Sequence, residues 1–320
     1  MKVGLGNKMA AVTLVTVGLL ATGCGSNGGT TNNSSGTTST AELSETVNLA
    51  TEQAVSAAQT VEPTLYAFLS NNNSDRSIFK GISEYLIPSA YAASCSSDGS
   101  TISNCSSSSL PAITRTYNGC NIGNSNIVLS GTTTYTYSSP GCSVIGFDKS
   151  VTRTTNLTMT GKLGGTVTIT SDNAVDYRGN TIGGGQKLTA NSSLGLYTLE
   201  VQGVNRTLVS PAGNEVWNLS TRTTAPISVN GSPTSGLVLS SNGGALEIIH
   251  NKAKYVLALS LGNLTFNDTC NCPVSGAMTG VYSGSLDGTS TITYTGCGTA
   301  NVTTSRGESL SFSIDVCSAT

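Results

Sequence analysis

The stretch VTRTTNLTMT, residues 151–160, decides the fold class of this 320-residue chain. Its odd-numbered residues, among them Val151, Arg153 and Leu157, fall on one face, and its even-numbered residues, all threonine or asparagine, fall on the other. Such alternation, rich in β-branched side chains, is typical of an antiparallel strand with one packed and one solvated face. We therefore predict a strand here, with Val151, Arg153, Thr155, Leu157 and Met159 on one face.

The same alternation recurs in TTTYTY (132–137), TVTIT (166–170) and TITYT (291–295), and the most apolar segment, YVLALSL (255–261), is expected to be a central strand. Glycine-bearing turns such as GKLGG, YRGN and SLDG separate the segments. We count on the order of 14 strands. The predicted fold is mainly β: an antiparallel β-meander that forms a sandwich, a barrel or a strongly curved sheet.

A seven-residue pattern, T-x-T-Y-x-G-C, occurs twice, as TRTYNGC (114–120) and as TITYTGC (291–297). On a strand it places the threonines on the solvated face and the tyrosine on the packed face, and it predicts a turn at the Gly-Cys pair. A further cysteine, Cys142 or Cys317, follows 22 or 20 residues later. We interpret the repeat as a small disulfide-stabilised β unit near each end of the β region.

The chain contains nine cysteines, of which one, Cys24, belongs to the N-terminal signal described below. The other eight form two groups of four, and export to an oxidising compartment favours disulfides within each group. The disulfide candidates are Cys95, Cys105, Cys120 and Cys142 in the first group, and Cys270, Cys272, Cys297 and Cys317 in the second.

Three pairings are open within each group. If the LSGT segment is a hairpin turn, symmetry about it favours Cys120 with Cys142. In the second group two nearly symmetric choices, Cys272 and Cys317, compete for Cys297. The sequence therefore predicts the grouping and leaves the pairing open.

The start of the chain indicates export. Lys2 and Lys8 precede an apolar run, residues 9–20. This run is too short to span a membrane as a permanent helix. The run ends in the order Leu20, Ala21, Thr22, Gly23, Cys24. This order resembles the lipobox of bacterial lipoproteins, a family in which leucine is commonest where Ala21 stands. The resemblance implies that residues 1–23 are a lipoprotein signal peptide and that Cys24 carries acyl chains such as palmitate.

Acyl chains on Cys24 would hold a water-soluble body at a membrane, with each buried methylene contributing about 0.8 kcal/mol. The next residue is Gly25, whereas aspartate there favours inner-membrane retention in well-studied lipoproteins. The resemblance therefore implies a lipid anchor in the outer membrane, with the periplasmic or surface face left open.

Composition divides the mature chain into three parts. Residues 24–40 contain the lipidated cysteine and a low-complexity flexible linker. Residues 41–93 form a helical segment, in which apolar residues recur at helical spacing up to Pro63 and a second short helix is predicted over 75–86. Residues 94–320 are the disulfide-stabilised β domain.

Charge excludes one large class of partners. Only 10% of the residues are charged, and the formal net charge of −2 becomes −4 when Lys2 and Lys8 leave with the signal peptide. A mildly acidic chain without a basic run does not fit a nucleic-acid-binding protein.

Few residues offer acid–base or nucleophilic chemistry. The only histidine, His250, shares a predicted strand face with Leu246 and Ile248, and no G-x-S-x-G segment presents a serine. We interpret it as a strand-end histidine satisfied by the turn at Asn251. A metal site built on Cys-Asn-Cys at 270–272 with this histidine would lack C-x-x-C spacing, so we predict no metal and no cofactor.

A carboxylate pair for glycoside chemistry could be drawn from Glu200, Glu215 and Glu247, but one tryptophan and 5% aromatic residues argue against a sugar-binding cleft. The segments DNAVD (172–176) and NDTC (267–270) do not match the spacing of a calcium loop. The T-x-T rows suggest an ice-binding array, yet their irregular spacing favours a solvated face. We therefore assign no catalytic residue.

These observations favour a non-enzymatic, lipid-anchored protein of the cell envelope that serves as a structural or interaction module for an envelope partner. Beyond the lipobox, the chain resembles Ser/Thr-rich envelope lipoproteins in style, and that resemblance implies no activity. The alternative is a carrier that holds an apolar ligand in a curved β-sheet, with the helices as a lid. A hydrolase is the weaker third hypothesis and requires Glu200, Glu215 or His250 to converge in one pocket.

Overall fold

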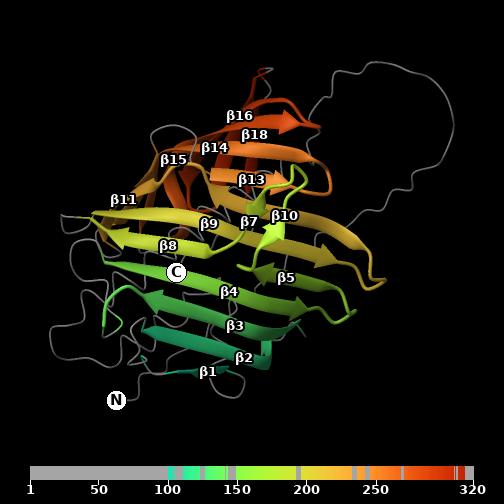
Figure 1. Ribbon diagram of the computed structural model, residues 1–320. Helices are drawn as coiled ribbons and strands as arrows, with labels where there is room; N and C mark the ends of the chain where they lie inside the picture. The colour runs from blue at the N-terminus through green and yellow to red at the C-terminus, as the bar shows by residue number, and fades with distance from the viewer. Residues whose placement is uncertain are drawn as a thin grey trace, which may run out of the picture. The chain divides into compact units, whose positions relative to one another are not determined.

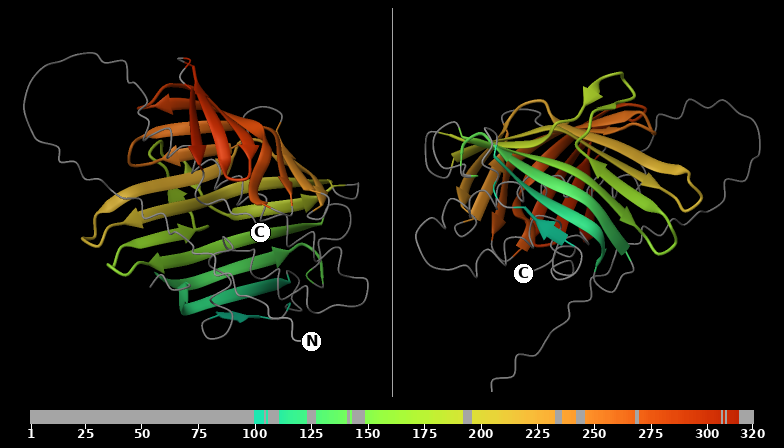
Figure 2. Two further views of the ribbon diagram at one scale, coloured as in Figure 1. Left: turned by 180° about the vertical axis from the view of Figure 1, so that it is seen from behind. Right: turned by 60° about the horizontal axis from the view of Figure 1, so that its bottom comes forward.

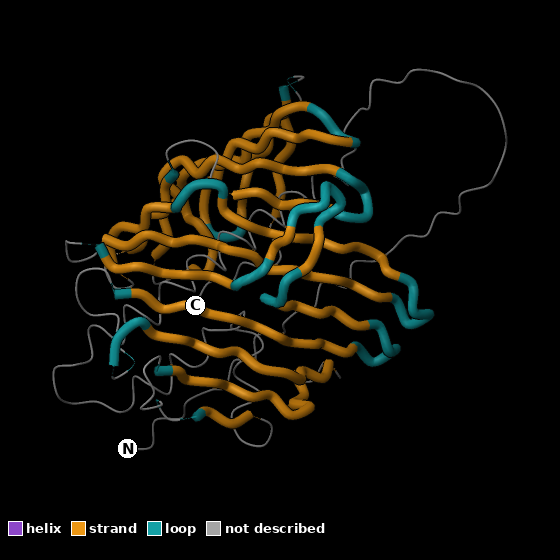
Figure 3. Tube along the Cα trace, viewed as in Figure 1, coloured by secondary structure: helices purple, strands orange, loops and turns teal. Residues whose placement is uncertain are grey.

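The computed structural model describes the strand-rich part of the chain, and the described residues contain no helix (Figure 3). They are residues 100–103, 105, 111–122, 127–140, 142, 149–191, 196–232, 236–241, 246–267, 270–305, 307 and 309–313. The predicted signal peptide, linker and helices lie outside this set. Within it, nothing forms a helix capable of crossing a membrane. The fold is mainly β, as predicted.

Eighteen strands are described. The first nine are β1 (Ser100–Ile102), β2 (Ala112–Ile122), β3 (Ile127–Tyr137), β4 (Ser150–Thr160), β5 (Thr166–Thr170), β6 (Ala174–Val175), β7 (Thr181–Ile182), β8 (Gly185–Ala190) and β9 (Leu196–Val209). The other nine are β10 (Glu215–Thr223), β11 (Ile227–Ser232), β12 (Gly236–Ser240), β13 (Leu246–His250), β14 (Tyr255–Asn267), β15 (Cys270–Gly284), β16 (Gly288–Gly296), β17 (Thr299–Thr304) and β18 (Ser309–Ser313). The sequence count fell short because strands as short as β6 and β7 contain too few alternations to be recognised.

Sixteen of these strands form one antiparallel sheet, in which some long strands pair on one side with two shorter strands (Figure 1). The 14-residue β9 pairs through its first half with β8 and β11, and through its second half with β5 and β10. In the same way β14 pairs with β13 and then β12 on one side, while β15 runs along its other side. At residues 171–184 and 224–226 the chain crosses from one half of the sheet to the other.

The sheet bends strongly (Figure 2). In the right-hand view β2–β4 and the strands after β13 curve toward the same side, which gives the sheet an inner and an outer face. We define the inner face as the one that carries Leu257 and the outer face as the one that carries Ile249; the two side chains belong to adjacent registers of the β13–β14 pair. Of the architectures predicted, the structure has the strongly curved sheet.

The inner face carries two hydrophobic clusters. The large core lies mainly over β8–β17, and its fully buried members include Leu199, Leu239, Leu259, Leu264 and Ile292. The small core lies over β2–β4 and consists of Tyr117, Cys120, Leu129 and Leu157, with Met159 packed against it. The apolar segment YVLALSL is part of β14 and contributes to the large core, as predicted.

Two glycines inside strands accompany the repeated pattern. Gly131 in β3 has a φ of 115° and Gly276 in β15 has a φ of 102°, a backbone conformation that other residues rarely adopt. At either position a Cβ would collide with a backbone oxygen of the neighbouring strand. Gly131 lies directly opposite Tyr117, and Gly276 directly opposite Tyr294. The repeat therefore marks two equivalent places where a glycine allows the sheet to curve and a buried tyrosine lies across from it.

The strand part of the repeat is as predicted, and the predicted turn at its end is found in the second copy but not in the first. In the first copy a β-bulge between Tyr117 and Cys120 lets β2 continue, so there is no turn. In the second copy Cys297 lies in the turn between β16 and β17. The expectation that LSGT forms a hairpin turn is wrong, because Gly131 is the bend inside β3.

The described disulfides join cysteines of the same group. Cys105 pairs with Cys142, with 5.9 Å between their Cα atoms, and Cys270 pairs with Cys297 at 5.8 Å. Hairpin symmetry suggested Cys120 as the partner of Cys142, and Cys272 or Cys317 as the partner of Cys297. None of these pairings is formed. Two more cysteines are disulfide-bonded to partners outside the described residues, namely Cys120 and Cys272.

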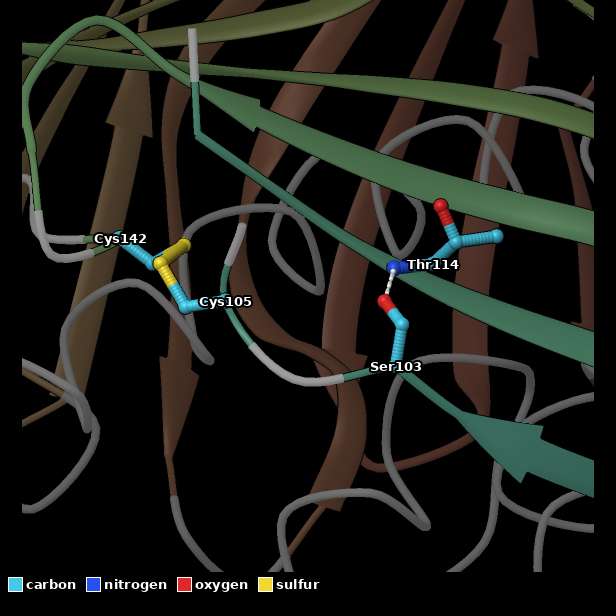
Figure 4. Close-up of a disulfide and its surroundings, with 4 residues drawn as sticks. All are labelled: Ser103, Cys105, Thr114 and Cys142. Carbon is cyan, nitrogen blue, oxygen red and sulfur yellow. Dashed lines mark hydrogen bonds between the residues drawn. A yellow bond between two sulfur atoms is a disulfide. The ribbon is translucent and has the colours of Figure 1, made fainter. Parts of the chain in front are cut away.

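The Cys105–Cys142 disulfide ties the segment after β1 to the segment after β3 (Figure 4). Close to it, the backbone N–H of Thr114 in β2 donates a 2.8 Å hydrogen bond to Ser103 Oγ. The N–H of Ser103 donates in turn to the carbonyl oxygen of Thr114 at 2.9 Å. The edge of the sheet beside the small core is thus held by a covalent bond and by strand pairing.

The β6–β7 hairpin covers part of the outer face (Figures 1 and 2). We call residues 171–184 the flap. Ile182 of the flap is buried against Ile249 and Val256 of the sheet. Beneath it Asn205 Nδ2 donates to two flap carbonyl oxygens at 2.9 and 3.0 Å, and Ser220 Oγ donates to Asn205 Oδ1 at 2.7 Å. These hydrogen bonds anchor the flap to the sheet, so the polar side chains of Asn205 and Ser220 have a structural role.

Candidate binding site on the inner face

His250 closes a turn. It is buried on the inner face at the end of β13, where its Nδ1 accepts a 3.1 Å hydrogen bond from the N–H of Ala253. Its ring centroid lies 5.0 Å from that of Tyr255. Burial lowers the pKa of His250, so the neutral imidazole is favoured. The interpretation as a strand-end histidine agrees with this geometry.

The three glutamates proposed for glycoside chemistry are separated. Glu200 lies opposite Lys187, and Glu247 pairs with two arginines of the outer face at 2.8 and 3.4 Å. Glu215 is exposed at the start of β10 and acts on His250 only through a minor electrostatic attraction. The structure therefore brings no carboxylate pair together from these residues.

In the described part of the chain, no group of three His, Cys, Asp or Glu side chains is arranged to hold a metal ion. Within the DNAVD segment, Asp176 Oδ1 accepts 2.9 Å hydrogen bonds from the N–H groups of Arg178 and Asn180, which builds the flap turn. In the NDTC segment, Cys270 is in a disulfide.

The inner face of β2–β4 carries two rows of polar side chains instead. In the first row Arg115 of β2 lies opposite Thr133 of β3, which lies opposite Thr155 of β4. In the second row, two residues along, Tyr135 lies opposite Arg153, which lies opposite Gln186 of β8. We call these six residues the inner polar cluster.

The two arginines of the cluster lie on the two strands that flank β3. Strands lie about 4.8 Å apart and rise about 3.4 Å per residue, so the Cα atoms of Arg115 and Arg153 are about 12 Å apart. Both long side chains can therefore reach the space beside Thr133 and Tyr135 on the strand between them. Arg153 Nη1 donates to Gln186 Oε1 at 3.4 Å. The Arg115 guanidinium lies 5.1 Å from the centre of the Tyr117 ring on the same strand.

Most of the cluster is shielded from solvent. Five of its six residues are 2–8% exposed, and Arg153 is partly buried. Three shielded atoms, Thr133 Oγ1, Tyr135 OH and Arg153 Nε, have no hydrogen-bond partner among the described residues. Leaving a buried polar group unsatisfied costs about 1–3 kcal/mol. These three neighbouring atoms are the observation that makes the cluster a candidate binding site.

The tyrosines near the cluster are neutral. Burial raises the pKa of Tyr117 and of Tyr137 to about 12. Burial also raises the pKa of Tyr135, although Arg153 and Arg115 act in the opposite direction. A neutral phenol can donate a hydrogen bond. The cluster therefore offers guanidinium, phenol and hydroxyl donors to one small space.

The cluster contains two arginines, Arg115 and Arg153. The described ion pairs lie at the flap and use Asp176 and Glu247, and none of them involves Arg153. A further arginine, Arg206 of β9, also lies on the inner face, opposite Ile169. The cluster sits between the small core and the large core along β3 and β4, where low polarity strengthens electrostatic interactions.

Comparison with protein-family models, with curated proteins and with solved structures gave no match. The site is therefore interpreted from its own geometry. One signal for it is present in the sequence, because Arg115 fills the x position of the first T-x-T-Y repeat, where the second copy has the buried Ile292.

Proposed function

We propose that this protein is a non-enzymatic, lipid-anchored module of the cell envelope that binds a ligand through the inner face of its curved sheet. The observation that carries the proposal is the inner polar cluster, with its three shielded and unsatisfied atoms, Thr133 Oγ1, Tyr135 OH and Arg153 Nε. Binding sites commonly combine apolar walls with a few convergent polar groups. The lipobox resemblance at Cys24 supports anchoring in the outer membrane.

The chemistry of the cluster favours binding over catalysis. Arginines, hydroxyls and neutral phenols donate hydrogen bonds, but none of them is a base near neutral pH. Two residues that could supply a base have structural roles: His250 closes a turn, and Glu247 pairs with arginines on the outer face. This distribution supports a ligand that leaves chemically unchanged.

A carrier of an apolar ligand has less support. The apolar side chains of the inner face form the two cores, and members such as Leu199, Leu239 and Leu259 have 0% exposed surface. They pack against other protein atoms and so offer no free apolar lining within the part of the chain that the structure describes. A purely structural role would not explain why the buried polar atoms of the cluster lack hydrogen-bond partners among the described residues.

The binding proposal predicts that envelope small molecules stabilise the protein. Protein purified from its membrane, stripped of ligand by unfolding with its disulfides intact and then refolded, should melt at a lower temperature than before stripping. The small-molecule fraction of an envelope extract should restore the melting temperature, because ligands that bind only the folded state stabilise it. Mass spectrometry should recover the ligand unchanged.

Arg153→Gln should abolish this restoration, whereas the matched control Arg222→Gln, an arginine of the outer face, should retain it. An extract that shifts neither the wild type nor the variants would refute the binding function. The anchor has its own readout: Cys24→Ser should leave the membrane fraction and keep its precursor mass. Unchanged labelling of that variant by a fatty-acid probe would contradict lipidation at this cysteine.

A further inference from the structure

We propose that the outer face of β2–β5 binds the surface of ice through a regular array of threonine side chains. This array is a second surface of the molecule, so the proposal goes beyond the ligand of the inner face.

The array follows from the alternation of four strands. Threonine fills every outward position except Asn156 among the even-numbered residues 114–116 of β2, 132–136 of β3, 152–160 of β4 and 166–170 of β5. The residues between them face inward and include members of the small core and of the inner polar cluster. Each of the outward threonines is partly exposed to solvent. We call these threonines the threonine array.

Strand register brings the array into rows. Thr134 of β3 lies opposite Thr114 of β2 on one side and opposite Thr154 of β4 on the other. Farther along β4, Thr158 lies opposite Thr168 of β5. The four strands lie side by side in the sheet (Figure 1). The irregular intervals between the T-x-T segments, which favoured an ordinary solvated face, therefore exist along the chain and not in the sheet.

The array has two repeat distances. Neighbouring strands lie about 4.8 Å apart, and alternate residues of one strand lie about 6.8 Å apart. The oxygen atoms on the prism faces of hexagonal ice repeat at two similar distances, at right angles to each other. Because a β-branched side chain has few χ1 rotamers, the threonine hydroxyl and methyl groups are held in place before binding. Within one row, a 3.0 Å hydrogen bond between Thr114 Oγ1 and Thr134 Oγ1 orients the hydroxyls further.

The side chains of the array argue against other partners. None of its positions carries a charge or an aromatic ring. A nucleic acid requires positive charge, and the centre of a protein interface is enriched in aromatic residues and arginine. The sugars of a crystalline polysaccharide commonly stack on aromatic rings. Ice requires none of these groups, only hydroxyl and methyl groups at a matching spacing.

Solvent exposure alone does not produce such a face. Elsewhere on the outer face, one row across β10 and β13–β16 consists of Arg222, Glu247, Ala258, Val281 and Thr289. This row belongs to the same side of the same sheet, yet it contains two charged and two apolar side chains. The uniformity of β2–β5 therefore requires a cause of its own, and recognition of a regular surface supplies one.

The test grows ice slowly from a solution of the full-length lipidated protein in lipid nanodiscs. Growing ice excludes solutes that do not adsorb to it, so the protein should be enriched in the ice relative to empty nanodiscs. Single ice crystals held just below the melting point should develop flat facets with the protein and remain round with empty nanodiscs. A parallel sedimentation assay with crystalline cellulose and chitin measures binding to polysaccharide.

The variants localise the surface. Thr134→Tyr combined with Thr158→Tyr should abolish enrichment and faceting, because two rings inside the array prevent close contact with a flat crystal. Tyrosine suits strands, so the sheet should be retained, and chemical denaturation checks this. The matched control Thr293→Tyr lies on the outer face of β16 between Ala277 and Asn301, outside the array, and should behave as the wild type.

A milder variant decides if the double variant does not fold. Thr158→Val keeps the shape of the side chain and removes one hydroxyl. The protein concentration that gives half-maximal enrichment in ice should then rise roughly 2- to 10-fold, because one hydrogen bond is lost. An unchanged concentration would contradict a role for the array.

Three results would overturn the proposal. The first is that ice excludes the wild type as completely as empty nanodiscs. The second is that the double variant and Thr293→Tyr are enriched equally. The third is sedimentation with cellulose or chitin without enrichment in ice, which would assign the array to a polysaccharide. Each of these results leaves the binding function of the inner face standing, since no member of the array belongs to the inner polar cluster.

Discussion

The strands β2–β4 and the strands β13–β16 share a sequence pattern and differ in what their inner face holds. Each region contains one copy of T-x-T-Y-x-G-C, with a buried tyrosine opposite a glycine of positive φ. In β13–β16 the inner face is mainly apolar and includes Leu257, Leu259 and Ile292, although the buried His250 and Ser290 also lie on it. In β2–β4 the small core has four buried members, and the remaining inner positions include Arg115, Thr133 and Arg153.

The difference shows that two regions of one meander can have different roles, one in stabilising the fold and one in holding polar groups. The large core supplies hydrophobic stabilisation to β13–β16, whereas β2–β4 depends more on strand pairing and on the disulfide at Cys105. Inner positions of β2–β4 that packing does not need are then free to hold polar groups. Polar residues at core positions are a mark of function when the rest of the sequence agrees with the fold.

The largest expected effect comes from emptying the large core. Leu257→Ala should lower the free energy of unfolding by about 2–5 kcal/mol, because it removes buried methyl groups and leaves a cavity. The matched change in the small core, Leu157→Ala, should lie at the lower end of that range, about 2 kcal/mol. Chemical denaturation of both variants measures the difference. Equal losses would mean that the two regions do not differ in how they are stabilised.

The next effect concerns the disulfides. Replacing Cys105 and Cys142 by serine should lower the free energy of unfolding by about 2–4 kcal/mol, because the unfolded chain regains loop entropy. Loss of Cys270–Cys297 should have a similar global effect, since the two bonds close sequence separations of 37 and 27 residues. The contrast is local: limited proteolysis should cut β2–β4 first in the Cys105/Cys142 variant. Protection of β2–β4 in that variant would show that the small core suffices.

The smallest effect is a pH dependence confined to one region. The pKa of His250 is lowered in the folded state by burial, so the unfolded chain binds more protons than the folded one as the pH falls below about 6.5. The contribution of the neutral His250 to the free energy of unfolding is present above the unfolded-state pKa and is lost as the pH falls through the folded-state pKa. The slope is at most about 1.4 kcal/mol per pH unit.

Amide hydrogen exchange between pH 7 and pH 5 should therefore show easier opening of β13–β14 at the lower pH, after correction for intrinsic exchange rates. The strands β2–β4 should show no such change, because His250 is the only histidine in the chain. His250→Gln should remove the dependence. A dependence that persists in this variant would assign it to another group.

Much of the fold follows from local pattern. The period-two alternation of residues 151–160 correctly places Val151, Arg153 and Leu157 on one face, since strand geometry alone fixes that alternation. The same rule places Tyr117 on the packed side of the repeat. The hairpin turn predicted at Gly131 is wrong for a physical reason, because a glycine that permits positive φ suits a turn and a bend inside a strand equally well.

The candidate site depends on register, which local pattern does not encode. Alternation indicates that Arg115 and Arg153 each face inward, but not that β3 lies between their strands or that Gln186 comes alongside through the half-length strand β8. The pairing of Cys105 with Cys142, which the sequence left open, depends on the same kind of information: it follows from where the segments after β1 and β3 end, rather than from symmetry about a turn.

The half-length strands have an evolutionary consequence. Wherever two of them share one side of a long strand, the chain must leave the sheet in its interior and re-enter it, as at residues 171–184 and 224–226. Growth of the chain at such a crossing adds a module above the sheet and leaves every strand length and every register unchanged. The flap, inserted between β5 and β8, has the form of such an addition, and the three-residue crossing at 224–226 has the form of the same junction before any addition. A lineage with this architecture can therefore acquire new outer surfaces by insertion while its inner face, and the polar cluster on it, stays as it was.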